Sequence, residues 1–375
     1  MNKKVIVHFT KDLTGRSDGI FNTIRAIIDE TNDGTFHHII LYEEESEVSV
    51  AIEKNGYIGK PVKGMRKKVP LKAILNYMNV IRSSNADVVH THALKPLLIS
   101  LITNVFLKKK LIFHFHGQLI KSEYYASSWQ MVLRALLILL LKLNKITAIA
   151  PSDPNKIYLQ SEMPYFSDVV VGSPGAESIH QDSSNDNDDE IYSRIQRMKD
   201  DGVVVLCFTG RILPQKRVDR CLEMYKSVRK SSSTILLVIG EGEYLNYYKE
   251  AYSEYQDVWF LGYRQDVRRI FQYIDAFILT SDYEGFPLVL WEVMAAGKPI
   301  VATKVSGIEE VLMSSQGGFV FNRDNIMEGI NYLNILISQE DVRLKMGKEA
   351  YNYFVENNPR FNFIKMMKKL YLYDR

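Results

Sequence analysis

The chain has 375 residues, 46% of them hydrophobic, which is enough for two or three domains with buried cores. Its formal net charge of +3 is small for a chain with 47 basic residues, so the composition argues against nucleic acid as a partner. Cys207 and Cys221 are the only cysteines, and their apolar or helical surroundings predict buried thiols in a reducing compartment rather than a disulfide. No apolar run at the start is long enough for a secretion signal, so we expect a cytoplasmic protein.

Short β-type runs alternate with helical patterns through the first half of the chain, which predicts a parallel sheet covered by helices. The expected strands are VIVHF, HHIILY, ADVVHTH, LIFHFHG, ITAIA and DVVVG. A polar loop at residues 10–19, with Gly15 and Gly19, follows the first strand. Ligands of such sheets collect at the carboxyl ends of strands, so this loop is placed to approach a phosphate or sugar, although most loop glycines only turn the chain.

Two neighbouring strands of this half end in alternating histidines, His90 and His92 on one and His114 and His116 on the next. Imidazole is a common metal ligand, which raises the possibility of a metal site. No carboxylate or cysteine stands at ligand spacing beside them, so we expect no metal and favour histidines that satisfy hydrogen bonds at the strand ends.

The most apolar segment of the chain covers residues 127–145. Its unbroken run is about a dozen residues, short of the roughly 20 that a membrane span needs, and Arg134 interrupts it. Two interpretations remain, a buried helix and an interfacial helix that contacts an anionic membrane at the inner face of the plasma membrane. Basic clusters at 60–72 and 108–110 keep the second interpretation open. The side chains expected at the headgroups are Trp129, Arg134, Lys142 and Lys145.

The second half begins with an apolar strand, VVVLCFT, that ends at Gly210. Arg211 and Lys216 lie where this strand passes to a helix starting at about residue 218, so their charges and the helix N–H groups can converge on a diphosphate. Further on, Gly240-x-Gly242 lacks the third glycine of a dinucleotide-binding loop, and no phosphate loop of the G-x-x-x-x-G-K-[ST] type occurs. Oxidoreductase and P-loop functions are therefore disfavoured.

Two carboxylates stand eight residues apart in SDYEGFPLVLWEVMAAG, which the pattern predicts as a loop and the start of a helix after the strand DAFILT. Glu284 falls in the loop and Glu292 on the helix. Pro287 suits a first helical position, and the N–H groups over residues 285–288 are placed to receive an anion. Each carboxylate can accept hydrogen bonds from hydroxyl groups beside it, which suggests a phosphorylated sugar as the ligand.

Together with the GFP turn, the continuation AAGKPIVAT and the upstream GRILPQKRVD, these carboxylates resemble the E-x7-E signature of retaining glycosyltransferases of the fourth family, which depend on nucleotide sugars. The resemblance runs over nearly the whole chain. It implies an α/β protein with the GT-B architecture, two Rossmann-like domains facing across a cleft. The sequence departs from the family pattern at Asp18-Gly19 and Ser306-Gly307, where relatives often carry two glycines.

The resemblance divides the chain into four segments, and residues 173–190, which are polar and acidic, support the linker among them. The expected segments are an acceptor domain over 1–172, a linker over 173–200, a nucleotide-sugar-binding domain over 201–355 and a C-terminal helix over 356–375 that packs back on the first domain. The apolar spacing of FNFIKMMKKLYLY fits such a helix.

The resemblance also assigns roles to residues. The expected catalytic residues are Glu284, His116, Arg211 and Lys216, and the expected donor-binding residues are Gly19, Gly210, Arg211, Lys216, Tyr263, Arg264, Glu284, Gly285, Phe286, Pro287, Leu288 and Glu292. Arg211 and Lys216 would neutralise the departing diphosphate, so neither a metal nor another cofactor is expected. Glu284 would hold the transferred sugar, Glu292 the ribose, and His116 with Gly19 would close the site from the first domain.

The expected reaction moves a hexose or N-acetylhexosamine from a UDP-sugar, with GDP and ADP sugars left open, to a hydroxyl of a glycan, glycolipid or surface-polysaccharide acceptor. The anomeric configuration would be retained. Abundant Lys, Asn, Ile and Tyr suggest a bacterial source by association. Two alternatives stay open, a catalytically silent sugar-nucleotide-binding partner of another transferase and a nucleotide-sugar epimerase. A phosphorylase would need a lysine for pyridoxal phosphate, which the sequence does not indicate. The oligomeric state is also open.

Overall fold

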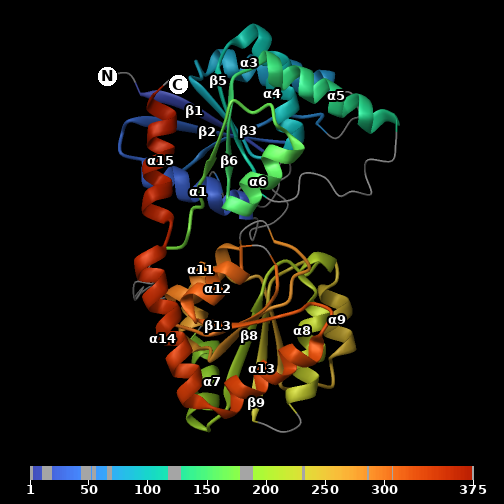
Figure 1. Ribbon diagram of the computed structural model, residues 1–375, viewed down its shortest axis with the longest axis vertical. Coiled ribbons are helices and arrows are strands. Elements are labelled where there is room, and N and C mark those ends of the chain that lie inside the picture. The colour runs from blue at the N-terminus through green and yellow to red at the C-terminus, as the bar shows by residue number, and fades with distance from the viewer. Residues whose placement is uncertain are drawn as a thin grey trace. The chain divides into compact units, whose positions relative to one another are not determined.

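The computed structural model describes residues 3–10, 19–43, 52, 56–65, 70–116, 128–177, 189–229, 233–284, 287–305 and 307–373. The chain forms two compact units (Figure 1). One unit consists of Met1–Pro174 together with Pro359–Arg375, and the other of Gly175–Asn358. Among the described helices, none combines the length and apolar character required to cross a bilayer.

The first unit is built on a seven-stranded sheet with the order β3-β2-β1-β4-β5-β6-β7, and all its pairings are parallel. Its strands are β1 (Lys4–Phe9), β2 (Phe36–Tyr42), β3 (Ile58–Pro61), β4 (Val88–Thr91), β5 (Lys110–His114), β6 (Ile146–Ala150) and β7 (Asp168–Val171). Its helices are α1 (Gly19–Thr31), α3 (Leu71–Ser83), α4 (Leu94–Leu107), α5 (Ser128–Leu143), α6 (Asp153–Glu162) and α15 (Arg360–Leu372).

Helices cover both faces of this sheet (Figure 1). Alternate residues of β1 belong to different cores, because successive side chains of a strand point to opposite faces. Val7 and Phe9 pack with α3, α4 and α5, whereas Ile6 packs with α1 and α15. Within α15, the side chains buried against the sheet are Phe363, Met367, Leu370 and Tyr371. The last helix of the chain thus belongs to the first unit.

The second unit contains a six-stranded parallel sheet with the order β10-β9-β8-β11-β12-β13. Its strands are β8 (Val204–Thr209), β9 (Thr234–Ile239), β10 (Val258–Gly262), β11 (Ala276–Leu279), β12 (Ile300–Thr303) and β13 (Gly318–Phe321). Its helices are α7 (Asp189–Asp200), α8 (Val218–Val228), α9 (Leu245–Ala251), α10 (Val267–Tyr273), α11 (Leu288–Ala295), α12 (Glu309–Ser315), α13 (Ile326–Ser338) and α14 (Glu340–Asn357). Cys207 and Cys221 are buried free thiols, as predicted.

The linker predicted over residues 173–200 is wrong in its second part, because residues 189–200 form α7. Tyr192 and Ile195 of this helix are buried in the core of the second unit. The polar composition of this segment, with as many basic as acidic side chains, hid an apolar spacing typical of a helix that packs on one face. Ala176 also belongs to this core, and its N–H donates to Asn358 Oδ1 at 3.3 Å, so the second unit begins before the predicted boundary.

Helix α5 combines features of both interpretations of the apolar segment. Leu137, Leu140 and Leu141 are buried in the core of the first unit, whereas Leu139 and Leu143 are 54% and 64% exposed. The side chains of Trp129 and Arg134 lie outside the described residues. The helix therefore packs on the unit with one face and presents leucines to the outside with another.

Candidate functional site

The second unit brings Lys216 and Glu284 into an ion pair at the carboxyl ends of two adjacent strands. Lys216 ends a short 3₁₀ turn, η2 (Pro214–Lys216), after β8, and Glu284 follows β11, the neighbour of β8 in the sheet. Lys216 Nζ lies 2.6 Å from Glu284 Oε1, and Ser281 Oγ donates to the same oxygen at 2.5 Å. The side chains are only 16% and 7% exposed, so solvent screens this pair weakly.

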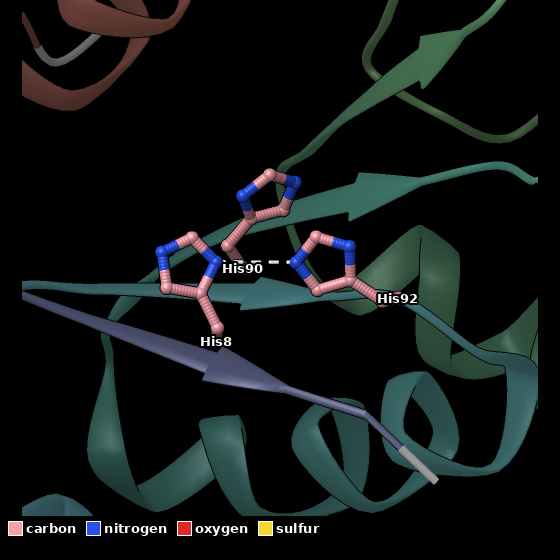
Figure 2. A group of neighbouring side chains, drawn as sticks. All are labelled: His8, His90 and His92. Atoms are coloured by element: carbon pink, nitrogen blue, oxygen red, sulfur yellow. Dashed lines mark hydrogen bonds between the residues drawn. The ribbon is translucent and has the colours of Figure 1, made fainter. Parts of the chain in front are cut away.

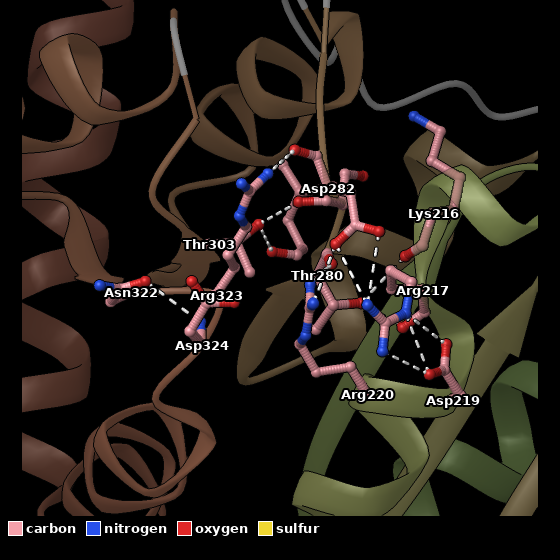
Figure 3. Close-up of polar contacts among 12 residues, drawn as sticks. Lys216, Arg217, Asp219, Arg220, Thr280, Asp282, Thr303, Asn322, Arg323 and Asp324 are labelled. Atoms are coloured by element: carbon pink, nitrogen blue, oxygen red, sulfur yellow. Dashed lines mark hydrogen bonds and ion pairs between the residues drawn. The ribbon is translucent and has the colours of Figure 1, made fainter. Parts of the chain in front are cut away.

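A network of charged residues holds the turn after β8 against the end of β11 (Figure 3). Arg220, which is buried, donates to the carbonyl oxygen of Thr280 at 2.6 Å and to Asp282 Oδ1 at 2.9 Å. The Thr280 hydroxyl donates to the carbonyl oxygens of Lys216 and Arg217 at 3.1 and 2.9 Å. The backbones that carry Lys216 and Glu284 are therefore tied together beneath the ion pair.

Arg217 adds a second link in this network. It has a left-handed backbone with φ of 49°, and its guanidinium pairs with Asp219 at 2.8 Å and with Asp282 at 3.3 Å. Hydrogen bonding to Asp219, aided by the charge of Asp282, raises the pKa of Arg217. Figure 3 shows the Lys216 side chain reaching away from the Arg217–Asp219 pair. This network was not predicted from the sequence, although charged residues just after a predicted strand, such as Asp282, are a detectable signal.

Glycines at the ends of β8 and β9 let two backbones touch. A Cβ on Gly240 would lie 1.9 Å from the Gly210 carbonyl oxygen, and one on Gly242 would lie 2.4 Å from that of Ile212. The backbones also join through the bond from Ile212 N to the Glu241 carbonyl oxygen at 2.8 Å. Gly240 and Gly242 thus allow close packing against the backbone of residues 210–212. The exposed Arg211 lies on that backbone segment.

Glu292 lies on α11 and faces Arg268 of α10, whose Nε is 3.7 Å from Glu292 Oε1. Arg268 also donates to Glu177 Oε2 at 2.5 Å. Arg268 was not predicted as a site residue, because a lone arginine on a predicted helix has no distinguishing pattern. Helix α11 begins at Leu288, so Pro287 occupies the position before the first helical residue rather than the predicted first position. Gly285 and Phe286 lie outside the described residues.

Tyr263 and Arg264 follow β10, as predicted, in the loop that leads to α10. The Arg264 guanidinium binds both carboxylate oxygens of Asp266, at 2.8 and 2.5 Å, and Asp266 also accepts a hydrogen bond from the Tyr192 hydroxyl. The Arg264 side chain is therefore engaged within the unit. The backbone groups of the loop are the part suited to contact a ligand.

The other two predicted site residues lie in the first unit. Gly19 is the first residue of α1, and a Cβ built on it meets no atom within 4 Å. His116 lies two residues beyond β5 and is mostly buried, and its Nε2 lies 3.1 Å from His92 Nδ1. Burial lowers the pKa of His116 to about 3, so the imidazole is neutral at physiological pH.

Histidines on four neighbouring strands of the first unit form one cluster. It contains the predicted strand-end histidines together with two that the sequence analysis missed, and its members are His8, His38, His90, His92, His114 and His116. In two trios, His8–His90–His92 and His92–His114–His116, one nitrogen of each ring lies within 4.8 Å of the others. Figure 2 shows the first trio. These trios are the candidate metal ligands among the described residues, so the expected absence of a metal site requires a test.

Two Rossmann-like units, with paired charges at the carboxyl ends of the strands in the second, are what the GT-B class of glycosyltransferase presents. Comparison with known proteins agrees. The structure superimposes on Anabaena HepE in complex with UDP with a TM-score of 0.78, at 16% identity, over 97% of this chain and 98% of that one. It matches WaaG, a glycosyltransferase involved in lipopolysaccharide biosynthesis, with a TM-score of 0.73, at 16% identity, over 99% and 100% of the two chains. The predicted fold class is confirmed.

Sequence comparisons match part of the chain to a family of glycosyltransferases. Residues 189–353 match the model of glycosyl transferases group 1. The chain is 22% identical over 309 residues, 80% of its length and 78% of the relative's, to the Escherichia coli UDP-Gal:alpha-D-GlcNAc-diphosphoundecaprenol alpha-1,3-galactosyltransferase. A Campylobacter jejuni N,N'-diacetylbacillosaminyl-diphospho-undecaprenol alpha-1,3-N-acetylgalactosaminyltransferase is 28% identical over 41% of this chain and 40% of its own length. Part of the chain, residues 189–353, thus matches the glycosyl transferases group 1 family, and the protein is a glycosyltransferase.

Proposed function

We propose that the protein transfers a hexose or N-acetylhexosamine from a UDP-sugar to a hydroxyl of a lipid-linked glycan, with retention of the anomeric configuration. The Lys216–Glu284 pair carries this proposal, because it sets a cation and a hydroxyl-binding carboxylate 2.6 Å apart, as the junction between a sugar and a diphosphate requires. Similar proteins support the two substrates. HepE was crystallised with UDP-glucose, and the Escherichia coli and Campylobacter jejuni relatives are named for lipid-linked acceptors.

A thermal-shift panel of UDP, GDP and ADP sugars tests the donor. A ligand at 100 times its dissociation constant stabilises the folded state by about 2.7 kcal/mol, so the preferred nucleotide gives the largest shift. Release of the nucleoside diphosphate on addition of an undecaprenyl-diphosphate-linked glycan then tests transfer. Binding of the nucleotide sugar without release of the diphosphate would indicate a catalytically silent partner of another transferase. Conversion of the donor to an isomer would indicate an epimerase.

The charges of the second unit suggest how the donor bond breaks. Negative charge develops on the departing diphosphate, and Lys216 with Arg211 would stabilise it where it forms, without a metal ion. One oxygen of Glu284 already accepts hydrogen bonds from Lys216 and Ser281, which makes this carboxylate a poor nucleophile for the anomeric carbon. We therefore favour attack on the same face, in which the departing phosphate oxygen takes the proton of the acceptor hydroxyl.

The stereochemistry is expected to be retention. An NMR time course of the reaction, in which the anomeric proton of the first product formed is followed, measures it directly. An α-linked donor should give an α-linked product before any mutarotation. An inverted product would contradict both the same-face mechanism and the roles given to Glu284 and Glu292.

Glu292 is expected to serve the nucleotide. Its carboxylate, turned toward Arg268, would accept the ribose hydroxyls, so Glu292→Gln should weaken nucleoside diphosphate binding about tenfold through loss of a charged acceptor. Arg268→Ala should weaken it less, since Arg268 acts by orienting the carboxylate. Calorimetry with UDP measures both effects. Glu356→Gln, an exposed site on α14, serves as the matched control, and equal affinities in all three variants would remove Glu292 from the site.

Membrane contact is the remaining part of the proposal, and its surface lies at the ends of α4 and α5. The α4–α5 surface consists of Val105, Phe106, Leu139 and Leu143, which are 49%, 74%, 54% and 64% exposed. Lys108, Lys142 and Lys145 are exposed beside it. Asn104 Nδ2 donates to Asn144 Oδ1 at 3.1 Å and joins the two helix ends. Exposed apolar side chains with lysines at nearby chain positions suit an anionic lipid surface, where a lipid-linked acceptor is found.

Flotation with anionic vesicles at low salt should recover the protein, and added salt should release it, because each lysine near such a surface contributes about 1 kcal/mol. Phe106→Ser with Leu143→Ser should reduce recovery. Leu344→Ser, at a leucine 65% exposed on α14, should not. Absence of the unmodified protein from the vesicle fraction would retire membrane contact while leaving the transferase proposal intact.

A further inference from the structure

Four of the clustered histidines and a threonine form one continuous hydrogen-bonded chain in the first unit. Thr31 Oγ1 lies 2.9 Å from His38 Nε2, and His38 Nδ1 lies 3.1 Å from His8 Nε2. His8 Nδ1 lies 3.2 Å from His92 Nε2, the bond drawn in Figure 2, and His92 Nδ1 lies 3.1 Å from His116 Nε2. This hydrogen-bonded chain runs from the end of α1, past β2, β1 and β4, to His116, two residues beyond β5.

The rings in this chain are neutral. Burial is the main cause that lowers the pKa of each, to about 4 for His38 and to about 3 for His116, and well below the ordinary value for His8 and His92. A neutral imidazole donates from one nitrogen and accepts at the other. Each bond in the chain therefore fixes the direction of the next.

Thr31 sets the direction of the whole chain. Its hydroxyl lies 2.5 Å from the Ile27 carbonyl oxygen, which can only accept, so the single hydroxyl proton is used there. Thr31 Oγ1 must then accept from His38 Nε2–H, which leaves His38 Nδ1 to accept from His8 Nε2–H. His8 Nδ1 in turn accepts from His92 Nε2–H, and His92 Nδ1 accepts from His116 Nε2–H.

We propose that this hydrogen-bonded chain holds His116 in the Nε2–H tautomer, with Nδ1 as an acceptor for a hydroxyl of the donor sugar, and that Thr31 is its distant positioning residue. The ligand role rests on the proposed function, whereas the tautomer does not. His90 stands outside the chain, because its Nδ1 pairs with the Tyr371 hydroxyl at 2.8 Å.

A metal ion explains the trio His92–His114–His116 less well. Ligand lone pairs lie in the plane of the imidazole, and a zinc ion would need three of them to meet at about 2.0–2.1 Å from the nitrogens. His114 and His116 are stacked, with centroids 4.4 Å apart and planes only 18° from parallel, so their lone pairs do not converge. Binding through His92 and His116 would also break their hydrogen bond.

Long-range ¹H–¹⁵N correlation spectra of the ¹⁵N-histidine-labelled full chain report the tautomer of each ring. We expect the Nε2–H form for His116, assigned by its loss in His116→Gln. Thr31→Val removes the acceptor of the His38 Nε2–H. Because a buried donor without an acceptor is costly, His38 and the histidines bonded in sequence to it should shift toward the Nδ1–H form. Thr103→Val is the matched control, since it removes a buried hydroxyl that bonds to the Ile99 carbonyl oxygen at 2.8 Å, and it should leave the tautomers unchanged.

In kinetics, Thr31→Val should raise KM for the donor about two- to tenfold, the effect of one neutral hydrogen bond, with a smaller change in kcat. Three results would each overturn the proposal. They are the Nδ1–H form of His116 in the unmodified protein, unchanged tautomers in Thr31→Val, and ¹⁵N shifts across the cluster on adding one equivalent of Zn²⁺. The spectra need no substrate, so their outcome is separate from failure of the transferase proposal.

Discussion

Replacing Glu284 with glutamine is expected to lower turnover about a hundredfold while the affinity for nucleoside diphosphate stays near that of the unmodified protein. Glutamine keeps the size of the side chain and an oxygen that accepts from Lys216 and Ser281. It removes the negative charge that would hold sugar hydroxyls as the anomeric carbon becomes positive. A hundredfold loss in rate corresponds to about 2.7 kcal/mol of transition-state stabilisation.

Initial rates with saturating donor, together with calorimetry using UDP, separate the two effects. Glu223→Gln, at an exposed carboxylate on α8, removes the same charge from the same unit and should change neither. A variant with normal turnover would show that Glu284 serves only as the structural partner of Lys216. An equal loss of turnover and of UDP affinity would show that Glu284 contacts the nucleotide rather than the sugar.

The sequence predicted those parts of the fold and site that depend on local pattern. Apolar runs such as VVVLCFT became buried strands, and the first helix after β8 begins at Val218, as expected. The failure at residues 189–200 has a physical cause. The helix is polar over most of its surface, and burial of Tyr192 and Ile195 is decided by the sheet they meet, which composition does not show.

Contacts between residues far apart in the sequence are the other feature that the sequence could not predict. The family resemblance supplied Lys216 and Glu284, but their contact spans 68 positions and follows from the adjacency of β8 and β11. Arg268, Arg220 and the chain from Thr31 to His116 were beyond a single sequence for the same reason. His8 and His38 become neighbours of His92 only when β2, β1 and β4 align in register.

Lys216→Ala is expected to weaken nucleoside diphosphate binding and turnover more than Arg211→Ala. Losing a charge-assisted hydrogen bond costs about 1.5–3 kcal/mol, roughly ten- to a hundredfold in affinity, and this applies to both variants. Lys216 has a second role, since Glu284 is only 7% exposed and would lose its cation. An ionised carboxylate left in such a place without its partner is costly. Arg211 is exposed, so its loss leaves no buried charge behind.

Calorimetry with UDP and initial rates measure both losses, and Lys226→Ala, at an exposed lysine on α8, is the control for removing a positive charge. A double-mutant cycle with Glu284→Gln isolates the pair: the loss in thermal stability caused by Lys216→Ala should shrink when Glu284 is already uncharged, whereas that of Arg211→Ala should not change. EDTA should leave activity intact, because fixed cations supply the charge at the diphosphate. Unchanged UDP affinity in both variants would show that the diphosphate binds elsewhere. Activity that EDTA abolishes and a divalent ion restores would show that a metal, rather than these cations, stabilises the charge of the diphosphate.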